Sequence, residues 1–252
     1  MKSTKGLSYG DLAWTEPIIA PPGEYAGENE LYVNIIREHA RDDAKEILHL
    51  ACGAGGNDFT FKKHFTVTGV DISQEMLAIA KELNPEVTYV LGDMRSVDLG
   101  KRFDAVVIPD SIDYAATLPE LEMTIATACK HLKPDGVLLI VAKTREEFQE
   151  NNFCYTGGKE DIEITVFENN HVCKTDRSSY EATIIYLIRR KEHLKIYTDR
   201  HVLGLFSHNE WLSTLRDAGL SVKHEKLEGF YDRFILGDGY YPMQAYIGIK
   251  PA

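Results

Sequence analysis

The sequence is organised around residues 46–58, EILHLACGAGGND. This stretch begins as an apolar run of strand character and ends in small residues followed by polar ones. A strand that breaks into a tight glycine turn and then a helix lets backbone N–H groups approach a ligand closely. A glycine-rich turn alone is a weak signal for a nucleotide-like ligand, so its interpretation depends on the motifs that follow it in the chain.

The composition indicates a globular protein with an acidic surface. Hydrophobic residues make up 44% of the 252 residues, which is ample for a core. The net charge of −11 argues against a nucleic-acid-binding surface, which needs clustered Lys and Arg to neutralise phosphates. No apolar run is long enough to span a membrane, and no secretion signal follows Met1. The length fits one large α/β domain, or one domain carrying an elaboration.

The four cysteines are widely spaced and form no CxxC pair. Reduced thiols are the simpler interpretation, and we therefore expect a cytoplasmic protein. The sequence leaves the oligomeric state open, with a homodimer as one option.

Strand and helix patterns alternate between residues 28 and 142. Continuous apolar runs predict five buried strands, at 46–51, 67–71, 87–91, 103–108 and 137–141. Helices are expected at 28–41, after the glycine turn to about residue 64, after Ser73 as an N-cap, and at 119–132, with a turn at 133–136. This alternation predicts an α/β protein with a doubly wound, mostly parallel sheet covered by helices on both faces.

The pattern changes after residue 150. Strand-like segments follow one another at 162–167, 171–176, 182–190 and 194–205, with turn residues at 168–170 and 191–192. Since no helix separates them, we expect an antiparallel β insertion after the fifth strand. Ser207 and Glu210 then form a capping box that begins a helix, and strands at 221–227 and 243–249 complete the main sheet.

The first 30 residues are rich in aromatic residues, prolines and glycines, and they include the apolar pair Ile18 and Ile19. Prolines exclude a long helix here, and the apolar side chains need burial. We expect an irregular segment laid across another part of the protein, either as a lid over a site or as ordinary packing.

Three features come at consecutive strand ends, where doubly wound sheets bind their ligands. The first is the small-residue turn at 53–56. Asp71 ends the second strand, where its carboxylate can accept hydrogen bonds from both hydroxyls of a ribose. Asp93 follows the third strand and can accept one from an exocyclic adenine amine. Each acid alone is more often a solvated loop residue, and the three features together predict a ligand with an adenosine moiety.

These motifs resemble those of the class I S-adenosylmethionine-dependent methyltransferases. The similarity covers residues 45–142 and is carried by segments 47–56 (the first motif), 70–77 (the ribose motif), 92–95 (the adenine motif), 103–107 and 132–138 (strands four and five). It implies a Rossmann-like methyltransferase fold, with seven strands in the order 3-2-1-4-5-7-6, strand seven antiparallel, and a single methyltransferase domain over residues 1–252.

His49 departs from the family pattern, because it stands where that family usually carries Asp or Glu near the methionine ammonium of the cofactor. Backbone carbonyls of the turn are the alternative partner for that ammonium. An NAD-dependent dehydrogenase fits less well, since its GxGxxG motif needs a glycine at position 58. Asp58 stands there and would repel a diphosphate, whereas S-adenosylmethionine has a sulfonium and no phosphate.

The outer part of the chain resembles the small-molecule N-methyltransferases that dimethylate nucleotide-linked amino sugars, and their glycine-methylating relatives. In the sugar enzymes the loop after strand four carries a His or Tyr beside the acceptor amine, and Tyr114 matches it. Arg233 stands where they carry an arginine for a substrate phosphate. We expect a lid at 1–30 and an insertion at 150–206 that covers the substrate site and admits only a small acceptor.

Cofactor contacts follow from these motifs and from the aromatic residues of the lid. They are assigned to Trp14, Tyr25, Ala51, Gly53, Ala54, Gly55, Asp71, Ile72, Met76, Asp93, Met94, Arg95, Pro109, Asp110 and Ser111. Substrate contacts are assigned to Tyr9, Tyr114 and Arg233, catalytic roles to Tyr114 and His201, and no residue to a metal. Ordinary packing is the alternative for the aromatic residues, and a structural or substrate-orienting role is the alternative for His201. Bulk water is the alternative proton acceptor.

The resemblance implies methyl transfer from S-adenosylmethionine to a small-molecule acceptor, with an amine nitrogen as the favoured nucleophile and S-adenosylhomocysteine as product. Because the leaving group is neutral, the protein mainly has to align the reactants and exclude water. Methylation of oxygen or carbon, and a protein that binds S-adenosylmethionine without turnover, stay open as alternatives.

Overall fold

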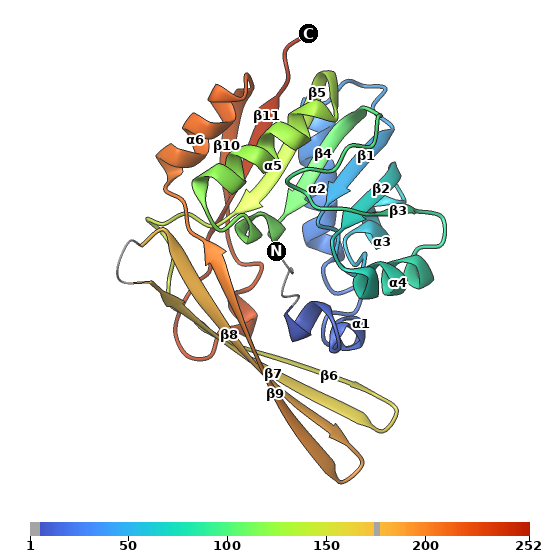
Figure 1. Ribbon diagram of the computed structural model, residues 1–252, viewed down its shortest axis with the longest axis vertical. Helices are drawn as coiled ribbons and strands as arrows, with labels where there is room; N and C mark the ends of the chain where they lie inside the picture. The colour runs from blue at the N-terminus through green and yellow to red at the C-terminus, as the bar shows by residue number, and fades with distance from the viewer. Residues whose placement is uncertain (1–5, 174–176) are drawn as a thin grey trace.

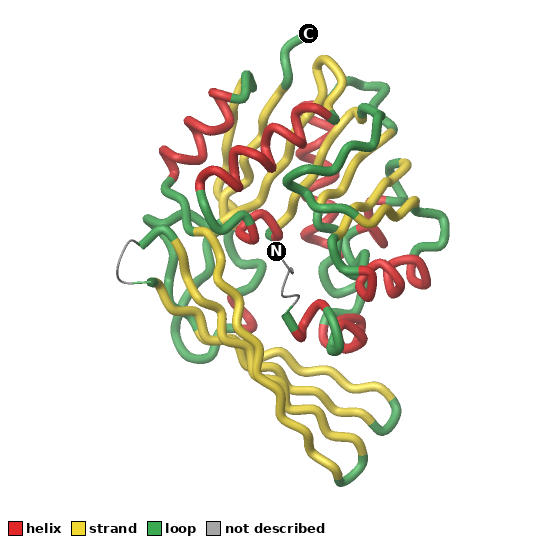
Figure 2. The backbone as a smooth tube through the Cα atoms, viewed as in Figure 1, coloured by secondary structure: helices red, strands yellow, loops and turns green. Residues whose placement is uncertain are grey.

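Two β-sheets organise the chain in the computed structural model, which describes residues 6–173 and 177–252 (Figures 1 and 2). The larger sheet has seven strands in the order β10 (Ser221–Leu227), β11 (Met243–Ile249), β5 (Leu132–Ala142), β4 (Phe103–Pro109), β1 (Glu46–Leu50), β2 (Thr66–Asp71) and β3 (Thr88–Leu91). The five strands β1, β2, β3, β4 and β5 run parallel to one another, and β11 runs antiparallel to both of its neighbours, β5 and β10. The predicted fold class and strand order are therefore confirmed.

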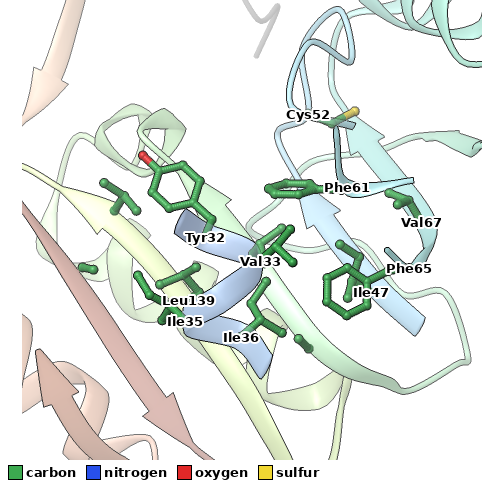
Figure 3. Close-up of a cluster of buried hydrophobic side chains, with 14 of the residues drawn as sticks. Tyr32, Val33, Ile35, Ile36, Ile47, Cys52, Phe61, Phe65, Val67 and Leu139 are labelled. Atoms are coloured by element: carbon green, nitrogen blue, oxygen red, sulfur yellow. The ribbon is translucent and has the colours of Figure 1, made fainter. Parts of the chain in front are cut away.

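Alternate residues of each central strand enter different cores, which explains the continuous apolar runs. Ile47 packs on one face, against α2 (Ala26–His39), α3 (Asp58–Phe61) and α4 (Gln74–Leu83). Leu48 and Leu50 pack on the other face, against α5 (Leu118–Lys130) and α6 (His208–Asp217). Figure 3 shows the first core, in which Tyr32 of α2 lies near Leu139 of β5.

Two helices begin as their sequences predict. Ser73 accepts a hydrogen bond from the backbone N–H of Met76 and caps α4. Ser207 and Glu210 form the complete capping box at the start of α6. No helix among the described residues has the length and apolar character that crossing a membrane requires.

The second sheet is antiparallel and comprises β6 (Asn152–Lys159), β7 (Ile162–Val172), β8 (Ser179–Arg190) and β9 (His193–Gly204), in that order. In Figure 1 it extends from the main sheet as long twisted hairpins. The antiparallel insertion is thus confirmed, but its details differ. β6 was not expected, because its glycines lower its strand propensity.

The predicted turn at 168–170 is wrong, because β7 continues through it and pairs with β6 and β8 as far as Val172. The separate strand expected at 171–176 is therefore also wrong in its described part, and 174–176 lie outside the described residues. Residues 133–136, where a turn was predicted, lie inside β5 and coincide with a shift in its pairing register with β4. There the pairing jumps from Phe103 with Leu132 to Ala105 with Val137.

The N-terminal segment consists of η1 (Leu7–Tyr9), η2 (Ala13–Thr15) and α1 (Glu16–Ile19), and it lies between the two sheets. Leu12 packs against β7 and β8 of the second sheet. Ala13 packs against Ala54 and Met76, which belong to the main domain. At Gly157 of β6 a Cβ atom would overlap the backbone carbonyl of Ile18, so this glycine lets the segment seat closely.

Candidate active site

The turn after β1 holds its backbone in the left-handed region at Ala51, Gly53 and Gly55, with φ of 56°, 54° and 74°. A Cβ on Gly53 would meet nothing within 4 Å, so its backbone conformation is what favours glycine there. At Gly55 a Cβ would lie 2.6 Å from the hydroxyl of Tyr89, so packing also excludes a side chain. The turn therefore presents bare backbone at the carboxyl end of β1.

Beside this turn lies a cavity of about 240 Å³, here called the cofactor cavity. Its walls come from the ends of β1, β2 and β3, from the loop after β4 and from the N-terminal segment. It brings together many of the residues assigned to the cofactor from sequence: Ala51, Gly53, Asp71, Ile72, Asp93, Met94, Arg95 and Ser111. The glycine turn, Asp71 and Asp93 therefore all line the cofactor cavity.

Asp71 is held by the backbone around it. Its Oδ2 accepts a hydrogen bond from the N–H of Gly53 at 2.8 Å, and its Oδ1 accepts one from the N–H of Ser73 at 2.8 Å. Burial raises the pKa of this carboxyl, and the two N–H donors oppose that rise. Each oxygen keeps a second lone pair for a ligand hydroxyl.

Asp93 lies in a charge network that the sequence reasoning missed. Arg95 donates to it from Nη2 at 2.7 Å and from Nε at 3.0 Å, and also pairs with Glu120 at 2.5 Å. Although desolvation raises the pKa of Asp93, the Arg95 guanidinium and backbone N–H lower it overall. Arg95 therefore orients the carboxylate as well as lining the cavity.

His49 and Asp58 form a buried pair beneath the turn. Nδ1 of His49 lies 2.7 Å from Oδ1 of Asp58, and Tyr89 donates its hydroxyl to Oδ2 at 2.9 Å. Asp58 is therefore engaged inside the protein, at the position that a glycine occupies in dehydrogenases. With Nδ1–H donating to Asp58, Nε2 of His49 is left as an acceptor.

Two further cavities adjoin the cofactor cavity. The first, of about 320 Å³, is lined by Tyr25, Ala54, Met76 and Pro109 among other residues, and the second, of about 190 Å³, lies under the second sheet. We call them together the acceptor cavities. Tyr9 and Ser111 line all three cavities, so they mark the place where these spaces meet.

Tyr114 and His201, which the sequence assigned to catalysis, are in contact. The Tyr114 hydroxyl lies 2.7 Å from that of Tyr9 and 3.2 Å from Nδ1 of His201. Nε2 of His201 lies 3.0 Å from Asp199, which also accepts hydrogen bonds from Ser8 N–H and Oγ. Desolvation raises the pKa of both tyrosines, so their hydroxyls are neutral at pH 7.

Asp199 was not identified from sequence, and no motif marks it. Desolvation raises the pKa of its carboxyl, but the hydrogen bonds from Ser8 and the neighbouring His201 lower it overall. An ionised Asp199 favours the tautomer of His201 that carries its proton on Nε2, which leaves Nδ1 as an acceptor 3.2 Å from the Tyr114 hydroxyl.

The acceptor cavities also contain Lys143 and Glu168, which the sequence reasoning missed, beside Asp110, which it assigned to the cofactor. Lys143 at the end of β5 is 5% exposed and pairs with Asp110 at 2.5 Å and with Asp113 at 2.9 Å. Asp110 holds a left-handed backbone with φ of 60°, which is uncommon for a residue with a side chain. Glu168 of β7 lines both acceptor cavities.

Three residues assigned from sequence line none of these cavities. Gly55 packs against Tyr89, so its contribution is to the shape of the turn. Trp14 is 38% exposed on η2. Arg233 is exposed, stacks on Phe234 and pairs with Glu24 at 3.0 Å. Direct ligand contacts by these three residues stay predictions.

Comparison with known proteins places this geometry in a family. Residues 47–136 match the family described as a methyltransferase domain. That match spans the glycine turn, the ends of β2 and β3 and strand β4, so it agrees with the methyltransferase resemblance that these residues carry in the sequence. The resemblance inferred from the sequence is therefore confirmed, and so is the cofactor.

Within this class the chain is related to amino-sugar N,N-dimethyltransferases. It is 28% identical to the dTDP-3-amino-3,4,6-trideoxy-alpha-D-glucopyranose N,N-dimethyltransferase of Streptomyces venezuelae, over 82% of this chain and 86% of that protein. It is 29% identical to the dTDP-3-amino-3,6-dideoxy-alpha-D-glucopyranose N,N-dimethyltransferase of Streptomyces fradiae, over 84% and 91%.

Solved structures agree with this relationship. The crystal structure of Streptomyces venezuelae DesVI superposes with a TM-score of 0.76 at 26% identity, covering 91% of this chain and 92% of that one. The sugar N-methyltransferase KedS8 from a Streptoalloteichus species superposes with a TM-score of 0.80 at 23% identity, covering 100% and 96%. The second likeness speaks for the fold alone.

Proposed function

We propose that this chain methylates the nitrogen of a small-molecule amine, with S-adenosylmethionine as the methyl donor. The observation that carries the proposal is the junction of the cofactor cavity with the acceptor cavities at Tyr9 and Ser111. A donor bound at the strand ends would meet an acceptor held under the second sheet at this junction. The relatives that act on amines support nitrogen as the nucleophile.

The residues of the cofactor cavity, together with His49 and Tyr25 of the adjoining cavity of about 320 Å³, fit S-adenosylmethionine. Asp71 would hold the ribose hydroxyls through the lone pairs that its backbone donors leave free, and Asp93 would hold the adenine amine. Nε2 of His49 would accept from the methionine ammonium, so the His49–Asp58 pair would replace the single acid that this family usually carries. Trp14 and Tyr25 of the N-terminal segment would wall the cofactor from outside.

When bound, S-adenosylmethionine supplies a methyl carbon whose bond to sulfur breaks, with the electron pair kept by sulfur, as the amine lone pair forms the new bond. The protein contributes alignment of the amine and exclusion of water, which account for most of what such a displacement needs. We infer that the N-terminal segment is the lid and that the insertion roofs the acceptor.

An ammonium has no lone pair, so the acceptor must first lose a proton. We propose that Tyr114 takes this proton while passing its own to Nδ1 of His201, and that Asp199 stabilises the imidazolium that results. The 3.2 Å and 3.0 Å contacts along this chain support the relay. After methyl transfer the proton leaves to solvent, which resets the residues.

The acidic composition and the absence of a membrane-crossing helix among the described residues support a small acceptor without nucleic acid or membrane partners. A cytoplasmic location is part of the proposal and rests on the widely spaced cysteines.

Isothermal titration with S-adenosylmethionine tests the binding half of the proposal. S-adenosylhomocysteine formation on matched panels of amines and alcohols tests the chemical half. We expect a saturable cofactor site and turnover with amines alone. Turnover with alcohols alone would show that the accepting atom is oxygen. Cofactor binding without turnover on any acceptor would indicate a protein that binds S-adenosylmethionine and does not use it.

A further inference from the structure

We propose that the acceptor enters as a small cation without a phosphate group, its ammonium held by Glu168 and Asp110 among tyrosine rings. This inference rests on the proposed function and names the chemical class of its acceptor. It separates this chain from its relatives, whose named substrates carry a dTDP group.

The charges that line the acceptor cavities favour a cation. Among the described lining residues there are four carboxylates, against one ammonium and no guanidinium: Glu16, Asp110, Asp113 and Glu168 against Lys143. The ammonium of Lys143 is already shared between Asp110 and Asp113. Among the described lining residues, acidic side chains therefore outnumber basic ones.

Glu168 is the carboxylate that most needs a partner. It makes no ion pair with any residue in the described part of the chain, and its hydrogen-bond partners are the side chain of Asn170 and the Tyr155 hydroxyl, the latter at a long 3.5 Å. Desolvation raises the pKa of Glu168 above its ordinary value, although the Asn170 hydrogen bond and the Lys143 ammonium lower it, so ionising this carboxyl still carries a cost. An ammonium beside it would remove that cost.

Tyrosine rings complete the environment of a cation. Six tyrosines line the cavity of about 190 Å³: Tyr9, Tyr114, Tyr155, Tyr180, Tyr231 and Tyr241. Aromatic faces attract alkylated ammonium groups, and they do so most strongly where water is excluded. The Lys143 ammonium already uses one of these faces, since its Nζ lies 5.4 Å from the centroid of the Tyr241 ring.

A diphosphate, by contrast, would find no unengaged Lys or Arg among the wall residues that the structure describes. Phosphate groups are held by Arg or Lys, preferably in bidentate geometry. Lys143 is engaged by two acids, and Arg233 lines neither cavity and pairs with Glu24. The surplus carboxylates would repel an anion that approached them.

Two titrations of the full-length protein, with and without S-adenosylhomocysteine, test this inference. The cation probe is tetramethylammonium, followed by saturation-transfer NMR, and the anion probe is dTDP, followed by calorimetry. We expect tetramethylammonium to bind the wild type and Glu168→Gln to weaken it about tenfold or more, as loss of a charge-assisted contact would. The control is Glu163→Gln, which removes an exposed carboxylate from the same strand.

The inference is overturned if dTDP binds at micromolar concentration and displaces tetramethylammonium, above all if Arg233→Ala abolishes that binding. It is equally overturned if tetramethylammonium does not bind, or binds wild type and Glu168→Gln alike. Asp110→Asn, which keeps a side chain tolerant of the left-handed backbone, provides a second variant and should also weaken the cation. These results do not depend on turnover, whereas failure of S-adenosylmethionine to bind would refute the proposed function itself.

Discussion

An asparagine in place of Asp71 would remove a charge that holds both the turn after β1 and, by our proposal, the cofactor ribose. The carboxylate is 8% exposed and accepts backbone hydrogen bonds from Gly53 and Ser73, both at 2.8 Å. An amide of the same size has a single acceptor oxygen. One of the two backbone N–H groups would then face an NH₂ group, and the ribose would lose its charged acceptor.

The size of the effect follows from these contacts. A hydrogen bond to a charged group contributes about 1.5–3 kcal/mol. Losing one such bond to the ribose would raise the dissociation constant of S-adenosylmethionine by about 10–150-fold. Loss of the backbone contact would also lower the melting temperature of the protein without ligand. Calorimetry gives the first quantity and thermal denaturation the second.

The matched control is Asp98→Asn, which also removes a paired acid, here one that contacts Lys130 at 2.6 Å on the surface. We expect this variant to bind S-adenosylmethionine as the wild type does. If Asp71→Asn melts earlier but keeps the wild-type dissociation constant, Asp71 serves the turn alone. The assignment of the ribose to this carboxylate would then be refuted.

Three further expectations follow from other parts of the molecule. In Gly157→Ala the new methyl group would overlap the carbonyl of Ile18, so the N-terminal segment should be cleaved faster by protease and cofactor affinity should fall. Gly158→Ala, whose Cβ would find its nearest neighbour at 3.4 Å, should change neither. Asp199→Asn should lower kcat by about tenfold or more with little change in KM, because the imidazolium of the proposed relay loses its anionic partner; an unchanged kcat would argue against the relay. Burial raises the pKa of Glu28 to about 7 from 4.5. Between these two pH values the folded protein holds a proton that the unfolded chain has released, so the free energy of unfolding falls as the pH rises. Glu28→Gln should therefore be more stable than the wild type at pH 8 by up to about 3 kcal/mol, and its urea denaturation should show a smaller decline between pH 5 and pH 7.

The cofactor cavity was largely predictable because its signals are local. Asp71 and Asp93 each follow a strand directly, and parallel strands bring their carboxyl ends to one edge of the sheet. The small residues of the turn are likewise adjacent in sequence. Once the alternation of strands and helices was recognised, no long-range contact had to be guessed.

The acceptor cavities were not predictable in the same way. Glu168 was assigned to a turn, where a carboxylate would be solvated, whereas it belongs to the uninterrupted strand β7. In a strand, a displacement by one residue moves a side chain to the opposite face, so this error hid its position. The pair of His49 with Asp58 and the pairing of Lys143 with Asp110 depend on side-chain contacts that no spacing in the sequence encodes.

The N-terminal segment connects the cofactor cavity with the acceptor cavities. The backbone carbonyl of Tyr9 accepts a hydrogen bond from Ser73 Oγ, at the start of the helix beside the cofactor cavity. The preceding residue, Ser8, donates to Asp199 of β9 through both its N–H and its hydroxyl. Two adjacent residues therefore connect the main sheet to the inserted one. Because Tyr9 lines all three cavities, displacing this segment would open the cofactor cavity and remove the Ser8 hydrogen bonds from Asp199 in the same event.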